Sequence, residues 1–327
     1  MNTKLKTKLF ILVLCLLIAT PITGTGCQEE VRQPTAPSPS VLSTTLVPDG
    51  PLDVYLYAKQ SSPTTIPAKM IEVSQDVSLE SLAIWGVPAE DDFALGFALT
   101  LTSDSEASIV YDEITLEEYG WKKLSGDTIY LVQGSGTAAE SLKTTISNND
   151  FKYYDDSESL KAVALLPDGG TTKLAAVALV KPSDALIDFI TKAANTEGSD
   201  LINIVLNLVN LKVAVSGLYS PNQIDVAEIA EVTDIGGGIH NLDLGLLVLV
   251  KSGLPGFIVE FATEKFLTRY QFTESKLDEL TVYKGSWDTH DGEAVHVLVR
   301  VEGSHLFAAV SGQEAYAETL ITSVQVE

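Results

Sequence analysis

Cysteine and basic residues are scarce in this chain of 327 residues. Its two cysteines are Cys15 and Cys27, and so small a number excludes a framework of disulfide bonds. Lysine and arginine together number 21, against 44 aspartates and glutamates, which gives a formal net charge of −23. Proteins that bind nucleic acids neutralise phosphates with a basic surface, so the charge excludes nucleic acid as a partner.

Catalytic sequence patterns are also missing. The chain has no Gly-x-Ser-x-Gly elbow, no Ser-x-x-Lys pair, no His-Glu-x-x-His helix and no phosphate-binding loop ending in Gly-Lys-Ser/Thr. The glycines 236–238 lack the lysine of such a loop and are interpreted as a joint between structural units. The sequence therefore predicts no catalytic residue and no cofactor.

Long hydrophobic runs are limited to the N-terminus. Eleven apolar residues, 9–19, follow Lys4, Lys6 and Lys8. A basic segment followed by a short apolar one is typical of an export signal, and eleven residues are too few to span a bilayer. An uncleaved membrane anchor is the alternative, but Pro21 and the glycines after it would end such a helix early.

The residues Gly24-Thr25-Gly26-Cys27 follow this apolar run. They resemble the lipobox of bacterial lipoprotein precursors, although Gly24 stands where that family prefers leucine. The resemblance implies that residues 1–26 are a signal peptide and that Cys27 carries a lipid at the new N-terminus. It also implies a membrane-anchored protein on the extracytoplasmic side, including the outer membrane where the cell has one.

Residues 27–52 differ in composition from the rest of the chain. Five prolines are interleaved with serine and threonine, without apolar periodicity. Such a segment buries too little apolar area to fold and predicts an extended stalk. Without the three signal lysines, 18 basic residues face 44 acidic ones, a net charge of −26.

The remaining sequence alternates strand patterns with amphipathic helices and predicts an α+β fold. Residues 94–102 predict a strand, and Ser103 predicts the cap of the helix that follows. Residues 160–166 and 172–180 predict a hairpin around Pro167-Asp-Gly-Gly170. In the helix after Pro255, a buried face is expected from Phe257, Ile258, Phe261 and Leu267.

Two segments of the chain align with each other without gaps. Val132 and Leu142 match Val310 and Leu320 at an offset of 178, and Gly96 matches Gly245 at an offset of 149. The difference places an insertion around residues 271–304. The prediction is two related strand-helix-hairpin-helix modules with mostly antiparallel sheets, in an order that resembles the ferredoxin-like arrangement.

These patterns divide the mature chain into three folded parts. The first α+β module covers residues 53–158, a central α+β unit covers 159–240 and the second α+β module covers 241–327. The central unit is expected between or beside the two modules.

One loop concentrates residues able to bind a metal ion. The candidates are Asp288, His290, Asp291, Glu293 and His296. Their spacing matches neither the zinc nor the EF-hand pattern, and Asp and Gly also serve turns. A solvated loop is therefore preferred to a metal site.

Three functions remain open at this point. The preferred one is a non-enzymatic binding or structural module of the cell envelope, anchored by the lipid of Cys27, with an envelope protein or polymer as its partner. The alternatives are a hydrolase whose catalytic residues are dispersed in the sequence, and a metal- or small-ligand-binding lipoprotein.

Overall fold

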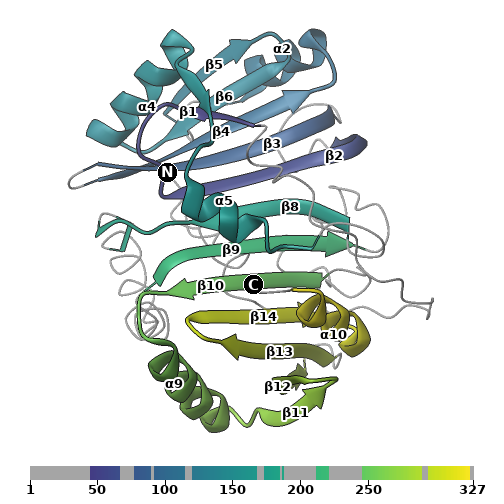
Figure 1. Cartoon of the computed structure of the whole chain (residues 1–327). Helices are drawn as coiled ribbons and strands as arrows, with labels where there is room; N and C mark the ends of the chain where they lie inside the picture. Colours follow the sequence, from purple (N-terminus) through teal and green to yellow (C-terminus); the bar gives the residue numbers. More distant parts are fainter. Residues whose placement is uncertain are drawn as a thin grey trace.

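The computed structural model describes residues 45–66, 77–89, 92–114, 120–167, 173–184, 186–187, 211–220, 245–288 and 294–324. Their dominant feature is one antiparallel sheet of twelve strands, in the order β11-β12-β13-β14-β10-β9-β8-β2-β3-β4-β6-β5 (Figure 1). A separate two-stranded ribbon, β1-β7, crosses one face of this sheet.

The first half of the chain supplies β1 to β8, whose bounds are Leu46–Pro48, Val54–Ile66, Val77–Pro88, Phe93–Leu101, Trp121–Ser125, Thr128–Gln133, Phe151–Tyr153 and Lys173–Val180. The second half supplies β9 to β14, with bounds Leu211–Ser220, Gly245–Ser252, Thr273–Leu277, Leu280–Asp288, Ala294–Glu302 and His305–Ser311. β1 lies within the range 27–52 that the sequence assigns to the stalk.

Within the described residues, five helices pack on the sheet: α2 (Asp104–Glu113), α4 (Thr137–Asn148), α5 (Ser157–Val163), α9 (Gly256–Arg269) and α10 (Glu314–Ser323). Helices α4, α5 and α10 share one hydrophobic cluster and therefore one face. Helix α2 packs on the opposite face, and α9 covers that same face at the other end of the sheet. No helix within the described ranges is long and apolar enough to cross a membrane.

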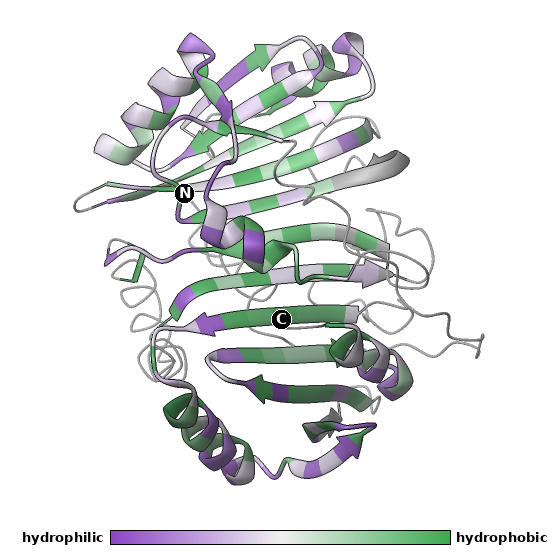
Figure 2. Ribbon diagram, viewed as in Figure 1, coloured by the Kyte–Doolittle hydropathy of each residue, from purple (hydrophilic) through white to green (hydrophobic). Residues whose placement is uncertain are grey.

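The core consists of two layers of side chains, one on each face of the sheet. The layer beneath α4, α5 and α10 runs through both halves of the chain, from Trp85 and Leu142 to Leu247 and Leu320. Figure 2 shows that β10, β13 and β14 are hydrophobic along most of their length. This is the pattern of strands that are covered on both faces.

The predicted α+β class is wrong. The strands do not form two separate modules around a central unit, and the order is not ferredoxin-like, because every described strand from both halves except β1 and β7 joins one sheet. β8 and β9, which belong to the predicted central unit, pair with each other and join β2 to β10. The protein is mostly β. The sequence-based prediction failed because local periodicity does not encode which distant strands pair with each other.

One predicted hairpin strand is a helix. Residues 160–166 were expected to be extended, yet α5 covers Ser157–Val163. The carboxylate of Asp156 caps this helix by accepting a hydrogen bond from Ser159 N at 2.8 Å. A short apolar run fits a strand and a buried helix equally well, and here the cap decides. The turn expected at Pro167–Gly170 extends beyond the described residues.

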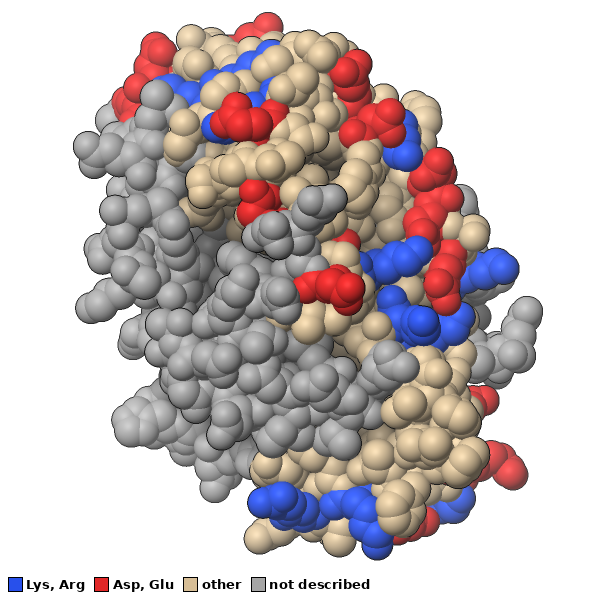
Figure 3. All heavy atoms as spheres, turned by 90° about the vertical axis from the view of Figure 1, so that its left-hand side faces the viewer, with Lys and Arg blue, Asp and Glu red and all other residues tan. Residues whose placement is uncertain are grey.

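Helix α5 is joined to the sheet by two ion pairs. Asp156 lies 2.5 Å from Lys181, and Glu158 lies 2.8 Å from Lys251. The hydrogen bond from Lys251 lowers the pKa of Glu158. Figure 3 shows basic and acidic side chains next to one another in a band on one side of the molecule. The acidic chain therefore uses part of its few cations to hold its own elements together.

The buried face of α9 differs from the expected one. Val259 and Leu267 are buried, whereas Phe257 is 73% exposed and Phe261 is 62% exposed. A Cβ on Gly256 would lie 2.8 Å from the carbonyl carbon of Gly303, so the helix begins in close contact with a turn of the sheet. That contact fixes the rotation of α9, which the apolar residues around its circumference leave undetermined.

The two ends of the sheet have the same connectivity. β4, α2, β5, β6 and α4 follow one another in the first half, and β10, α9, β13, β14 and α10 do so in the second, where β11 and β12 are additional. The neighbour orders β4-β6-β5 and β10-β14-β13 also agree. A Cβ on Gly96 would collide with Leu142 of α4, and one on Gly245 would collide with Leu320 of α10.

Candidate ligand-binding groove

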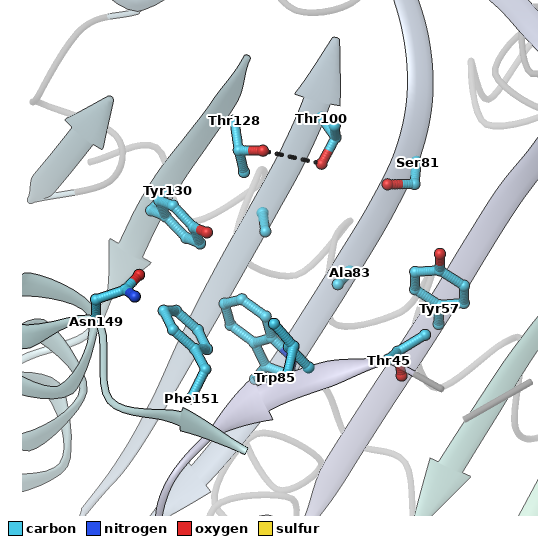
Figure 4. A pocket seen from close by; sticks show the side chains of 12 residues that line it. Thr45, Tyr57, Ser81, Ala83, Trp85, Thr100, Thr128, Tyr130, Asn149 and Phe151 are labelled. Atoms are coloured by element: carbon cyan, nitrogen blue, oxygen red, sulfur yellow. Dashed lines mark hydrogen bonds between the residues drawn. The ribbon is translucent and has the colours of Figure 1, made fainter. Parts of the chain in front are cut away.

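A groove of about 370 Å³ lies on the α4 face of the sheet, in the half that β2, β3, β4 and β6 form (Figure 4). Its walls are the β1-β7 ribbon and the end of α4. The described residues that line it are Thr45, Leu46, Tyr57, Ser81, Ala83, Trp85, Ala98, Thr100, Thr128, Tyr130, Asn149 and Phe151. We call it the sheet-face groove.

A row of hydroxyl groups crosses three neighbouring strands of the groove. Ser81 pairs in register with Thr100, and Thr100 pairs with Thr128. The Oγ1 atoms of the two threonines are 3.2 Å apart, and Figure 4 shows the three side chains in one line. Because side chains at paired positions point to the same face, the antiparallel register creates this row.

Two alanines and four aromatic rings shape the floor and the walls. Ala83 and Ala98 are paired neighbours on the floor, and the strand registers place Tyr57 next to Ala83 and Tyr130 next to Ala98. Figure 4 shows Ala83 between the two tyrosines. The rings of Trp85 and Tyr130 are stacked with their centroids 6.3 Å apart. Phe151 lies 5.6 Å from Tyr130, measured between centroids, and completes an aromatic wall.

The described lining of the groove carries no charged side chain. Burial raises the pKa of Tyr57, and a hydrogen bond with Ser81 only partly offsets this effect. Burial also raises the pKa of Tyr130, with a further contribution from the charge of Asp127. Both phenols are therefore neutral hydroxyls at physiological pH, able to donate and accept hydrogen bonds.

The β1 wall is fixed by a buried tyrosine cluster. Thr45 Oγ1 hydrogen-bonds to the hydroxyl of Tyr55, and the ring of Tyr55 lies 5.7 Å from that of Tyr154. Burial raises the pKa of Tyr154 to about 12. The ribbon is thus attached to the sheet beneath it, so the groove has a defined wall where the described chain begins.

The matched region at the other end of the sheet is filled. Two and four residues beyond Gly96 on β4 are Ala98 and Thr100, whereas the same steps from Gly245 on β10 reach Leu247 and Leu249. Both leucines are fully buried, as is Phe307, which pairs with Leu249. The same connectivity therefore accommodates a packed core, and the groove results from the small and hydroxylated residues at its own positions.

Comparisons with known proteins leave the chain without an assigned family. No protein-family model matches it, and no curated protein matches its sequence. Among solved structures, an N-terminal dehydratase from the difficidin assembly line is 13% identical, with 85% of this chain and 84% of that chain covered and a TM-score of 0.12. That score carries no information about fold or activity.

The five predicted metal-ligand candidates are only partly described. His290, Asp291 and Glu293 lie outside the described residues, as does the side chain of Asp288. His296 is on β13, where its Nδ1 lies 4.0 Å from a carboxylate oxygen of Glu314. Within the described ranges, no three His, Cys, Asp or Glu side chains are placed to hold a metal ion. Cys27 also lies outside them.

The sequence contains one pattern that indicates the groove, namely small and hydroxylated residues on a strand face that a helix covers. On β4 and β6, the alternation places Ala98, Thr100, Thr128 and Tyr130 on the face that also carries Gly96 and Val132, beneath α4. Hydroxylated and small residues on a face that a helix covers indicate incomplete filling. Finding the groove from sequence requires the strand pairing, because its described residues come from six strands.

Proposed function

We propose that this chain is a lipid-anchored extracytoplasmic protein that binds a ligand in the sheet-face groove without transforming it. The groove is the observation that carries this proposal, because its volume of about 370 Å³ lies within the range of roughly 300–1,000 Å³ of ligand sites. Its described lining offers hydrogen-bonding hydroxyls and aromatic rings, and no acid, base or thiol for catalysis.

Anchoring at Cys27 rests on the basic segment, the apolar run and the lipobox-like residues. The first groove residues, Thr45 and Leu46, follow Cys27 by only 18 and 19 positions. An extended linker of this length spans roughly 50–60 Å. The groove is thereby held near the membrane surface, where envelope polymers and proteins are concentrated.

Two experiments test the two parts of this proposal. Fatty-acid labelling of the wild type and of Cys27→Ser tests the anchor, which is refuted if both chains label equally or neither labels.

A photoreactive residue in place of Leu46, at the groove rim, tests ligand binding in intact membranes. The matched control is the same residue in place of Thr144, which is exposed on α4. Equal cross-linking from both positions would contradict binding in the groove.

A further inference from the structure

We propose that the ligand of the sheet-face groove is a neutral saccharide, bound as a short oligosaccharide or as a segment of a glycan chain. This inference rests on the proposed binding function and specifies the class of ligand. It is carried by the hydroxyl row, the aromatic wall and the uncharged lining, which are three independent properties of the groove.

The hydroxyl row provides matched partners for sugar hydroxyls. Ser81, Thr100 and Thr128 lie on adjacent strands, whose separation is about 4.8 Å. Thr128 Oγ1 donates to Asp127 Oδ1 at 3.0 Å, and Thr100 Oγ1 donates to Thr128 Oγ1. The two threonines therefore offer a ligand their remaining acceptor positions, to which sugar hydroxyls can donate. A purely apolar ligand would remove water from these acceptor positions without replacing its hydrogen bonds. Lipid chains are therefore disfavoured.

The aromatic wall suits the other surface of a sugar ring. A pyranose ring carries hydroxyls at its edge and C–H groups on its faces. Tyr130 and Phe151 are partly exposed, and their rings pack against Trp85 at centroid distances of 6.3 and 5.9 Å. Rings held in this way supply apolar area at a small entropic cost and, in Tyr130, a hydroxyl as well.

The uncharged lining selects against ionic ligands. A carboxylate or phosphate in the groove would lose water without gaining a charged partner from the described lining residues. The net charge of −23 for the whole chain adds long-range repulsion of anions. An acidic polysaccharide and a nucleotide are therefore excluded in favour of a neutral sugar.

A peptide fits the groove less well than a saccharide. Peptides that bind to sheets usually pair with an exposed edge strand through backbone hydrogen bonds. The floor of the groove lies on strands that have neighbours on both sides: β2 pairs with β8 and β3, β3 with β2 and β4, and β4 with β3 and β6. Their backbone groups are occupied by those neighbours, so an extended peptide would find few partners on the floor. In the wall, β1 and β7 have one described neighbour each, but each strand is only three residues long.

The test uses the full-length anchored protein in detergent, applied to an array of neutral oligosaccharides of glucose, galactose, mannose and N-acetylglucosamine, with uronic acid oligomers for comparison. We expect retention of at least one neutral series and none of the uronic acids.

Titration calorimetry should show about tenfold weaker binding for Thr100→Val, which removes one hydroxyl at nearly constant volume. Ala98→Leu, which copies the filled end of the sheet, should abolish binding, while the control Thr144→Val should bind as the wild type does.

Each outcome decides the ligand class separately from the binding function. Three results would overturn the proposal of a neutral saccharide ligand. They are preferential retention of uronic acids, retention of no saccharide, and equal affinity of Thr100→Val and the wild type. Thermal unfolding of each variant shows whether lost binding reflects lost folding. If saccharides fail while cross-linking from position 46 still exceeds that from position 144, the groove binds a ligand of another class. If both fail, the binding function is refuted as well.

Discussion

At the residue scale, Arg300 is a buried cation of the second half. It lies on β13 and is only 3% exposed. Its Nη1 donates to the carbonyls of Ile321 and Val324, both at 3.1 Å, at the end of α10. Its guanidinium also lies 4.7 Å from the ring centre of Phe307. A cation at this position satisfies carbonyls that the helix itself cannot.

Arg300→Met should therefore lower the free energy of unfolding by roughly 2–4 kcal/mol, because two buried carbonyls lose their donor. The matched variant is Lys123→Met. Lys123 donates to Ile146 O and Ser147 O at the end of α4, at 2.7 and 3.2 Å, but it is partly exposed, so a loss below about 1 kcal/mol is expected. Urea unfolding measures both, and equal losses would contradict the role assigned to burial.

Asp53 gives a pH-dependent prediction. It is 7% exposed, and its burial raises its pKa although Ser183 donates to the carboxylate through its hydroxyl and through N at 3.1 Å. A raised pKa means that the folded state binds the proton more tightly than the unfolded state. This contribution to stability is present below the usual aspartate pKa and is lost as the pH rises through the folded-state pKa.

Asp53→Asn should thus gain stability relative to the wild type as the pH rises from 3 to 7. The amide remains neutral throughout, and its oxygen can still accept from Ser183. Urea unfolding of both proteins at each pH measures the difference, in which the titration of other groups cancels. A difference that stays constant, or that shrinks as the pH rises, would show that the pKa of Asp53 is not raised in the folded state.

At the scale of elements, helix α9 illustrates how an apolar sequence can leave the buried face of a helix undecided. The spacing of Phe257, Phe261 and Leu267 suggested one buried stripe. In the structure Leu267 is 3% exposed, while Phe257 and Phe261 are on the surface. The rotation is set by the contact of Gly256 with Gly303, which depends on where the hairpin of β13 and β14 lies.

Leu267→Ala should consequently lower the free energy of unfolding by about 2–4 kcal/mol, which is the usual effect of truncating a buried leucine to alanine. Phe257→Ala should change it by less than about 0.5 kcal/mol, because the side chain is already in water. Denaturant midpoints at equal m-values measure both variants. A large loss for Phe257→Ala would mean that this ring is covered in the folded protein.

The cap at the N-terminus of α4 also depends on a residue that is distant in the sequence. The carboxylate of Asp92 accepts hydrogen bonds from Thr137 N and Ala138 N in the first turn, at 2.6 and 2.9 Å. The N-cap residue is Gly136, with φ of 82°. Because Asp92 is far away in the sequence, no local pattern could assign it as the capping group.

At the scale of the whole molecule, the continuous sheet makes the two halves depend on each other. One cluster beneath α4, α5 and α10 contains residues of both halves, and the β8–β9 and β9–β10 pairs join them through backbone hydrogen bonds. Separate modules would be joined by a linker and would unfold independently. A shared core predicts cooperation instead.

Calorimetric unfolding should therefore give one transition for the mature chain. Ile146→Ala on α4 and Leu247→Ala on β10 lie in different halves, and each should lower the stability by about 2–5 kcal/mol. Both should shift the same transition, with the calorimetric and van't Hoff enthalpies in agreement. Two resolved transitions, each sensitive to only one of the variants, would show that the two halves unfold independently.

The edges of the sheet have features that limit further pairing. β5 and β11, the outermost strands, are five residues long each and carry Lys122 and Lys123, and Glu274 and Lys276. Short, charged edge strands oppose association with other sheets. These edges therefore agree with the proposal that recognition takes place in the groove rather than at a sheet edge.

The sequence by itself determined the elements whose signals are local. The strand predicted over 94–102 and the cap predicted at Ser103 agree with β4 and α2. Residues within about one helical turn of each other specify such a cap, so short-range chemistry is sufficient. The anchor at Cys27 is likewise a prediction from contiguous residues, and it stays a prediction.

Only the tertiary structure decided the class of fold and the site. An apolar run such as 160–166 satisfies either a strand or a helix, and the partners of β8 and β9 are other strands far along the chain. The groove arises from Tyr57, Ser81, Thr100, Thr128 and Phe151 on five strands. Their proximity depends on the registers of those strands, and long-range register is the property that local periodicity leaves open.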